Sequence, residues 1–141
     1  MTVFYSTELA NYTATPVVKA ASAGYSARMQ RFRASITLAT QTTADTIVVA
    51  VVPAGYSFAF GVLTTDTSLG TSTISIGNTS TPALYRAAAV FTTTDTPTFF
   101  GKAAAIVQAT LAADQTIFIT IATASLPAAG QLVVDMYFSR Q

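Results

Sequence analysis

The sequence predicts an all-β protein, with about eight antiparallel strands in a jelly-roll-like β-sandwich that follows an extended N-terminal arm. Three observations lead to this fold class. Apolar and polar residues alternate with period two in several short segments, which is typical of strands with one buried face. These segments recur about every 10–15 residues and are separated by turns rich in Gly, Pro, Asp and Thr. Eight antiparallel strands in two sheets are the number found in a jelly roll.

Four segments in the first half of the β-domain predict strands. Alternation of apolar and polar side chains places strands at residues 32–38, 58–62 and 73–76. Residues 47–52 instead form the continuous run Ile-Val-Val-Ala-Val-Val, which ends at Pro53-Ala-Gly55. A continuous β-branched run is typical of a strand that is covered on both faces, and we expect this of residues 47–52.

The second half repeats this rhythm with two less regular segments. Residues 83–91 contain good helix formers, although their neighbours favour a strand. We expect residues 99–107 to form a strand with an Ala-rich middle, in which Gly101 allows a bulge. Residues 117–121 alternate clearly, and a turn at 126–130 leads to the last predicted strand at 132–138.

The low charge of the chain points to a permanent assembly. Only 9% of the 141 residues are charged, whereas about 25% are charged in an ordinary globular domain. Mean hydropathy is positive, yet no apolar run approaches the roughly 20 residues that a membrane helix needs. So few charges do little to keep copies of a protein apart. We therefore expect other protein to cover much of the surface, and we predict a homotrimer.

The residue types that are missing exclude several kinds of function. The chain has no Cys and no His, so it lacks disulfides and both the commonest general base and the commonest metal ligand. A net charge of +1 does not suggest nucleic-acid binding, and neither a G-x-S-x-G elbow nor a phosphate loop is present. The first residues lack the pattern of a secretory signal, so we expect synthesis in the cytoplasm. We predict no enzymatic activity, no cofactor, no metal, no membrane partner and no small-molecule ligand.

Four aspartates, Asp45, Asp66, Asp95 and Asp114, lie next to predicted strands. A carboxylate in such a position can accept a hydrogen bond from a backbone N–H two residues on and so close an Asx turn. Calcium ligation is the alternative, but no pair has the dense spacing of a calcium loop. We therefore predict a structural role in turns.

Residues 1–30 are predicted to form an N-terminal arm, and residues 31–141 the β-sandwich domain. Residues 1–33 have a net charge of +3, whereas the remaining residues have a net charge of −2. Four aromatic residues are more than a solvated tail requires, although a disordered terminus is the alternative. We expect the arm to lie on a neighbouring subunit, with arginines at its root facing carboxylates there. The predicted contact residues are Phe4, Tyr5, Tyr12, Tyr25, Arg28, Arg31 and Arg33.

Parts of the β-domain resemble small structural proteins of tailed bacteriophages. The resemblance rests on Gly61-Val-Leu-Thr-Thr-Asp-Thr-Ser-Leu-Gly70, Thr73-Ile-Ser-Ile-Gly77, Tyr85-Arg-Ala-Ala-Ala89 and the segment 126–138. In size and composition the chain is most similar to capsid cement, or decoration, proteins. The resemblance implies a β-rich trimer that binds the outer capsid surface and clamps neighbouring major capsid subunits. It also implies that the protein is part of the virion.

Two other functions remain open from the sequence. The first is a receptor-binding or carbohydrate-binding jelly-roll module of a phage tail or fibre. Tyr56 and Tyr85 lie near predicted turns and would be its stacking platforms, unless both rings pack at the rim of the sandwich. The second is another structural component of the tail or neck.

Overall fold

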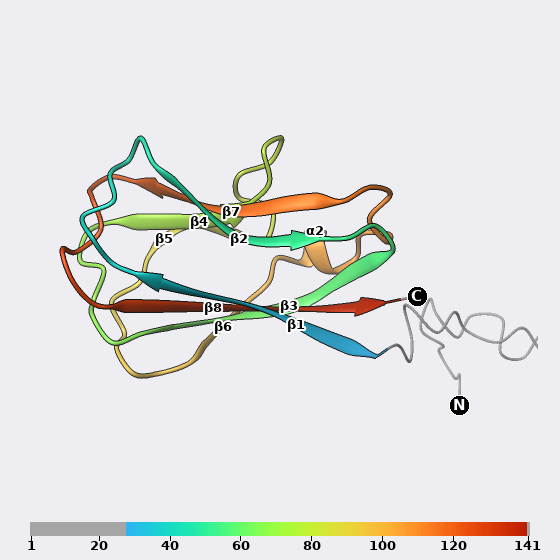
Figure 1. Ribbon diagram of the computed structural model, residues 1–141, viewed down its shortest axis with the longest axis horizontal. Coiled ribbons are helices and arrows are strands. Elements are labelled where there is room, and N and C mark those ends of the chain that lie inside the picture. The colour runs from blue at the N-terminus through green and yellow to red at the C-terminus, as the bar shows by residue number, and fades with distance from the viewer. Residues whose placement is uncertain (1–27, 141) are drawn as a thin grey trace, which may run out of the picture.

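A computed structural model describes residues 28–140, which form two four-stranded sheets packed face to face (Figure 1). The first, called here the β1 sheet, contains in spatial order β1 (Met29–Thr37), β8 (Gln131–Arg140), β3 (Tyr56–Thr65) and β6 (Thr98–Phe100). The second, the β2 sheet, contains β2 (Thr46–Val52), β7 (Gln115–Ala122), β4 (Thr73–Gly77) and β5 (Arg86–Val90). A short helix, α2 (Ala103–Ile106), follows β6.

The strand pairing is that of a jelly roll. β1 pairs with β8, β2 with β7, β3 with β6 and β4 with β5, and every pair is antiparallel. The pairs are nested, so the chain runs as one long hairpin that is folded over into two sheets. The predicted fold class, an all-β sandwich with eight antiparallel strands, is therefore confirmed.

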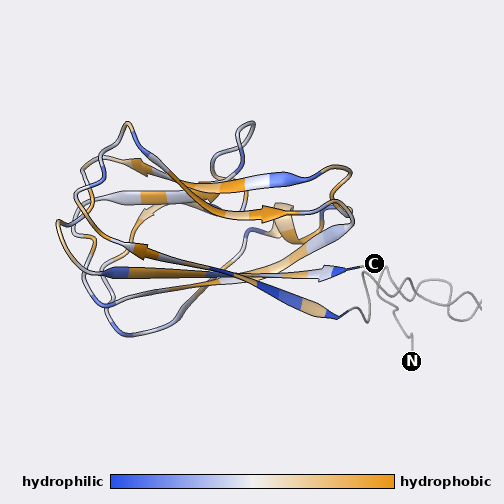
Figure 2. Cartoon of the chain, in the orientation of Figure 1, coloured by the Kyte–Doolittle hydropathy of each residue, from blue (hydrophilic) through white to orange (hydrophobic). Residues whose placement is uncertain are grey.

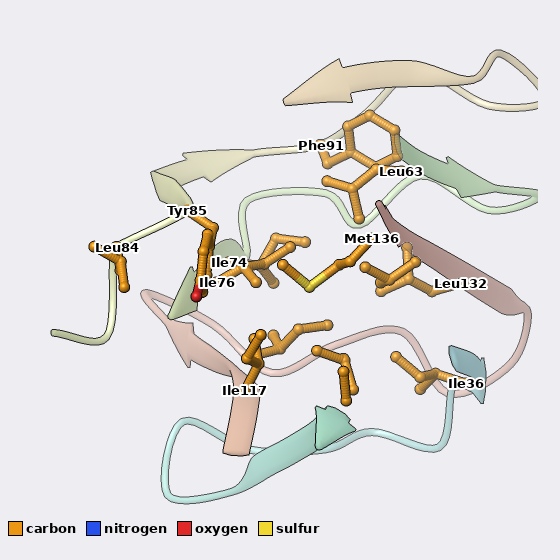
Figure 3. Packing of buried hydrophobic residues seen from close by; sticks show 14 of the residues in the cluster. Ile36, Leu63, Ile74, Ile76, Leu84, Tyr85, Phe91, Ile117, Leu132 and Met136 are labelled. Atoms are coloured by element: carbon orange, nitrogen blue, oxygen red, sulfur yellow. The ribbon is translucent and has the colours of Figure 1, made fainter. Parts of the chain in front are cut away.

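The core between the sheets is built from alternate residues of the strands (Figure 3). Ile117, Ile119 and Ile121 of β7 point inward and are fully buried, as their period-two spacing predicts. From the opposite sheet, the ring of Phe138 packs edge-on against Phe32 at a centroid distance of 5.6 Å. Because strands of both sheets pack into one core, the outer face of each sheet is held as a rigid surface.

Residues 47–52 differ from the prediction. They form β2, but Val48 and Val51 are each 58% exposed, so the expectation of burial on both faces is wrong. A bulge between Val48 and Ala50 places Val49 and Ala50 inward and turns the two flanking valines outward. Each sheet of a two-layer sandwich packs on one side alone, and residues 28–140 provide no third layer over β2.

The segment 99–107 also differs from the prediction of a single strand. β6 ends at Phe100, and the Ala-rich residues that follow turn into α2. Alanine is the strongest helix former, and here its propensity prevails over strand continuation. The uncertain segment 83–91 contains β5, while β1 begins at Met29, three residues before the predicted start. Within residues 28–140, no helix has the length and apolar character required to cross a membrane.

Candidate interaction surfaces

The outer face of the β1 sheet combines arginine, aspartate and aromatic side chains. On β8, Met136 and Phe138 point into the core, so Asp135 and Tyr137 face outward. Strand pairing places Arg33 opposite Asp135 and Arg31 opposite Tyr137. We call this surface the aromatic–arginine face, and its residues are Arg31, Arg33, Phe60, Phe99, Asp135 and Tyr137.

An ion pair lies within the aromatic–arginine face. Arg33 Nε donates to Asp135 Oδ1 and Arg33 Nη2 donates to Asp135 Oδ2, each at 2.7 Å. The Asp135 side chain is 11% exposed and that of Arg33 49%. The hydrogen bonds from Arg33 hold the pKa of Asp135 below its usual value against the opposing effect of burial, and the charge of Arg31 lowers it further. The chain thus neutralises its most buried carboxylate by itself.

Three aromatic rings form a row beside this ion pair. Tyr137 stacks on Phe60 with a centroid distance of 4.6 Å and an interplanar angle of 17°. Phe60 in turn lies 5.7 Å from Phe99, measured between centroids, and Phe99 is 72% exposed. A register shift between Phe58 and Phe60 turns these two residues of β3 to opposite faces, so the simple alternation expected at 58–62 is interrupted. Exposed aromatic and arginine residues together are typical of protein–protein interfaces.

One end of the β1 sheet is basic. β1 begins and β8 ends there (Figure 1), and Arg140 N–H donates to the carbonyl of Arg28 at 3.3 Å. Arg28, Arg31 and Arg140 are all exposed at this end. The guanidinium of Arg140 also lies 5.9 Å from the ring centroid of Tyr56. The basic end is the point at which residues 1–27 join the sandwich.

The predicted contact residues divide into two groups. Phe4, Tyr5, Tyr12 and Tyr25 lie outside the described residues, as does most of the predicted arm. Arg28, Arg31 and Arg33 lie at the start of the β1 sheet, where Arg33 is already paired with a carboxylate of its own chain. Contacts of these residues with a neighbouring subunit stay a prediction.

The outer face of the β2 sheet is different, because it is uncharged. Its exposed side chains are Val48 and Val51 of β2 and Val90 of β5, together with Thr116 of β7. We call this surface the uncharged face, and its residues are Thr46, Val48, Val51, Thr73, Ala88, Val90, Thr116, Phe118 and Thr120. In Figure 2, β2 is mostly hydrophobic, whereas a large part of β1 is hydrophilic.

Arg86 is the single charged residue in the four strands of the β2 sheet. Its guanidinium donates to the carbonyls of Ala89 at 3.2 Å and Val90 at 3.3 Å, and to the carbonyl of Ile74. Partial burial lowers the pKa of Arg86, which stays a cation. Its charge is therefore directed at backbone groups of its own sheet.

Tyr56 and Tyr85 do not form a stacking platform. Tyr56 is 5% exposed and Tyr85 1% exposed, and the Tyr85 ring packs against Phe58 at a centroid distance of 4.6 Å. The hydroxyl of Tyr85 donates to Gln115, and burial raises the pKa of Tyr85 to about 12. Packing in the sandwich, which was one of the two interpretations of these tyrosines, is thus confirmed.

Three of the four predicted turn aspartates accept backbone hydrogen bonds, but not in the expected geometry. Asp45 accepts from the N–H of Thr42, which precedes it. Asp66 accepts a hydrogen bond from the N–H of Gln131 at 2.7 Å, and Asp114 accepts one from the N–H of Ala54 at 3.0 Å. These bonds lower the pKa of Asp45 and Asp66. The carboxylates of Asp66 and Asp114 thus hold loops onto distant segments, and that of Asp45 holds a local turn, rather than closing the predicted Asx turns. Residues 28–140 contain no cluster of acidic residues suited to a metal ion.

Sequence analysis did not single out Phe60, Phe99, Asp135 or Tyr137 as a surface. The local signal was the sequence Val-Val-Asp-Met-Tyr-Phe at 133–138, in which a carboxylate interrupts an apolar strand. Its partner Arg33 lies 102 residues away, so the pair appears once the strands are aligned.

The fold resembles chains in three solved bacteriophage capsid structures. A chain of the cyanophage Pam1 capsid asymmetric unit aligns with a TM-score of 0.69 at 19% identity, covering 88% of this chain and 93% of that one. A chain in the capsid of Ralstonia phage GP4 aligns with a TM-score of 0.61 at 13% identity, covering 83% and 86%. A chain in the acidic stable capsid structure of Helicobacter pylori bacteriophage KHP30 aligns with a TM-score of 0.58 at 12% identity, covering 79% of this chain and 86% of that one.

No model of a known protein family matches the chain, and no curated protein does. At 12–19% identity the likeness to the three capsid chains establishes a common fold. It covers most of both partners in each comparison, so the whole sandwich is shared rather than a single sheet.

Proposed function

We propose that this chain is a capsid cement protein, a virion structural protein that binds the outer capsid surface and holds neighbouring major capsid subunits together. The observation that carries this proposal is the jelly roll shared over 88% of the chain with a component of a phage capsid. The proposed state is a homotrimer on the capsid surface, made in the host cytoplasm, with no enzymatic step.

The physical role requires an interface and no chemistry. A capsid packed with DNA is under outward pressure, and a protein that bridges adjacent subunits opposes their separation by adding contact area. The aromatic–arginine face suits this role because Phe99 is 72% exposed on a rigid sheet and Arg31 lies nearby on the basic end. Aromatic and arginine side chains provide most of the binding energy in many interfaces.

The predicted N-terminal arm extends the proposal. Residues 1–27 join the sandwich at the basic end, and we propose that this predicted arm lies on a neighbouring subunit. Burying one aromatic ring contributes about 1.5–3 kcal/mol, whereas an exposed ion pair contributes about 0–1 kcal/mol. The four aromatic residues of the arm should therefore contribute more to binding than its arginines.

The test is to add the purified full-length chain to phage capsids that lack it and to locate it by cryo-electron microscopy. We expect density over the junctions between major capsid subunits. Capsids that stay bare at micromolar protein would contradict the proposal. Density confined to the tail or neck of complete virions would instead support the other structural role.

Three variants of the full-length chain refine the test. Phe99→Ser removes the most exposed ring of the aromatic–arginine face, and we expect capsid binding to weaken about tenfold or more because interface aromatics dominate affinity. A second variant replaces the aromatic residues of the arm by serine, and a third carries Arg28→Gln/Arg31→Gln. We expect the serine variant to bind capsids more weakly than the glutamine variant. The residues replaced by serine are Phe4, Tyr5, Tyr12 and Tyr25. If the glutamine variant is the weaker binder, electrostatic attraction prevails and the proposed role of the aromatic residues is wrong.

A further inference from the structure

We propose that the uncharged face of the β2 sheet is the surface through which copies of this chain contact one another. The inference rests on the homotrimer of the proposed function and identifies the face that forms it. Three features of the β2 sheet lead to this assignment: exposed valines, missing charge and an edge strand that carries no charged residue.

The exposed valines are concentrated on β2. Val48 and Val51 are each 58% exposed, and strand pairing places them beside Phe118 and Thr116 of β7. The bulge in β2 brings both valines to the same outer side, although they are three residues apart. Two β-branched side chains held outward on a rigid strand favour burial against another surface.

The absence of charge favours a second copy as the occupant. Within the four strands of the β2 sheet, the lone cation Arg86 donates to carbonyls of its own sheet. Two such faces can meet without like-charge repulsion. A charged partner surface would lose hydration here and find no complementary charges, which is costly. The aromatic–arginine face, with Arg33 and Asp135, is the better match for a charged partner.

The edge strands point to the same occupant. β2 is hydrogen-bonded to β7 on one side and is the last strand of its sheet on the other. Natural edge strands avoid pairing with other chains by means of charges, bulges or short length. The edge strand β1 carries Arg31 and Arg33, and Arg86 covers carbonyls of the edge strand β5. β2 contains a bulge but no charged residue in its seven positions, so its open side is guarded less than the other edges and favours cover by another chain.

The test measures the mass of the purified full-length chain by light scattering, without capsids. We expect the wild-type protein at micromolar concentration to have about three times the chain mass of 14.7 kDa. The variant Val48→Glu/Val51→Glu buries two unpaired carboxylates in the contact, so its association should weaken at least about a hundredfold and a single chain mass should result. The matched control Val107→Glu changes a valine that is 80% exposed and lies outside the uncharged face, and it should keep the wild-type mass.

A second variant keeps the test informative if the glutamate variant fails to fold. Val48→Thr/Val51→Thr keeps the shape and β-propensity of both residues and adds no charge, so it should weaken association about tenfold while the circular dichroism spectrum stays unchanged. The inference is overturned if the wild-type protein has the mass of a single chain. It is also overturned if the glutamate variant is folded and has the same mass as the wild-type protein. Wild-type trimers that fail to bind capsids would contradict the proposed function and leave this assignment intact.

Discussion

The two outer faces of the sandwich present different chemistry on the same type of scaffold. On the β1 sheet, Arg33 is paired with Asp135 and Tyr137 is stacked on Phe60, so the polar and aromatic groups are already matched within the chain. On the β2 sheet, Val48 and Val51 stand exposed among threonines, and no charge is offered outward. Among the residues that lie in strands, the charged ones are thus found in the β1 sheet, with Arg86 of β5 as the exception.

This difference matches the two proposed contacts, one with the capsid and one with further copies of the chain. A face with fixed charges selects its partner, because a mismatch leaves a charge desolvated and unpaired. An uncharged face of valine and threonine has little selectivity of its own and depends on being covered at all times. Four changes, ordered by expected effect, would break or sharpen this comparison.

The largest effect is expected for Arg86→Met. The change removes the hydrogen bonds to the carbonyls of Ala89 and Val90, and because hydrogen bonds from charged donors are strong, we expect the free energy of unfolding to fall by about 2–3 kcal/mol. Urea unfolding followed by circular dichroism measures this loss. Arg86→Lys, which keeps the charge but not the planar fork, should lose an intermediate amount. Unchanged stability in Arg86→Met would show that the charge of Arg86 is available to a partner, and the β2 face would no longer count as uncharged.

Arg33→Gln tests whether the charges of the aromatic–arginine face are satisfied internally. Because Asp135 then lacks its partner, we expect the free energy of unfolding at pH 7 to fall, by less than in Arg86→Met. The pKa of Asp135 is lowered in the folded wild-type protein, so the stabilisation is present above the unfolded value near 3.9 and is lost as the pH falls through the folded pKa. The wild-type protein should therefore lose more stability than the variant between pH 6 and about pH 2. Equal losses in the two proteins would contradict the role of this pair.

A smaller effect is expected for the aromatic row. Tyr137→Leu removes the stack with Phe60 but keeps an apolar side chain, and we expect a loss of about 1 kcal/mol. A double-mutant cycle with Phe60→Leu isolates the ring–ring contribution, for which we expect a coupling of about 0.5–1 kcal/mol. Additive losses in the cycle would mean that the rings are held for a partner rather than by each other.

The smallest effect on folding is expected for Val48→Thr. This valine is 58% exposed and makes little contribution to the core, so unfolding at submicromolar concentration should change by no more than about 0.5 kcal/mol. The same change should reduce the rise of the melting temperature with protein concentration, because that rise reports association. A large loss of stability at low concentration would indicate that β2 is needed for the fold of the single chain.

Much of the fold was predictable because it depends on local pattern. Alternation at residues 117–121 fixes which side chains of β7 are buried, and the structure confirms this strand and the strand predicted at 132–138. The prediction at 99–107 was wrong because Ala-rich residues are compatible with a strand and a short helix, and tertiary contacts decide between them. The burial expected for residues 47–52 was wrong because a β-branched run does not reveal which of its faces another layer covers.

The candidate surfaces were predictable only in part. The low charge predicted a covered surface without indicating where it lies. The arginines at 28, 31 and 33 were recognised from charge asymmetry, whereas the aromatic row was not. Phe60 faces outward because of a register shift in β3, and this shift follows from pairing with a strand more than 70 residues away.

By itself, the sequence determined an all-β chain of about eight strands, the inward side of strands such as β1 and β7, and the absence of Cys and His chemistry. Period-two alternation and residue composition are local properties, so they can be recognised without knowing which strands pair. The tertiary structure decided the nested strand order, the pairing of Arg33 with Asp135 and the contrast between the charged and uncharged faces. These depend on contacts between residues distant in sequence, whose register is set jointly by core packing and bulges across both sheets.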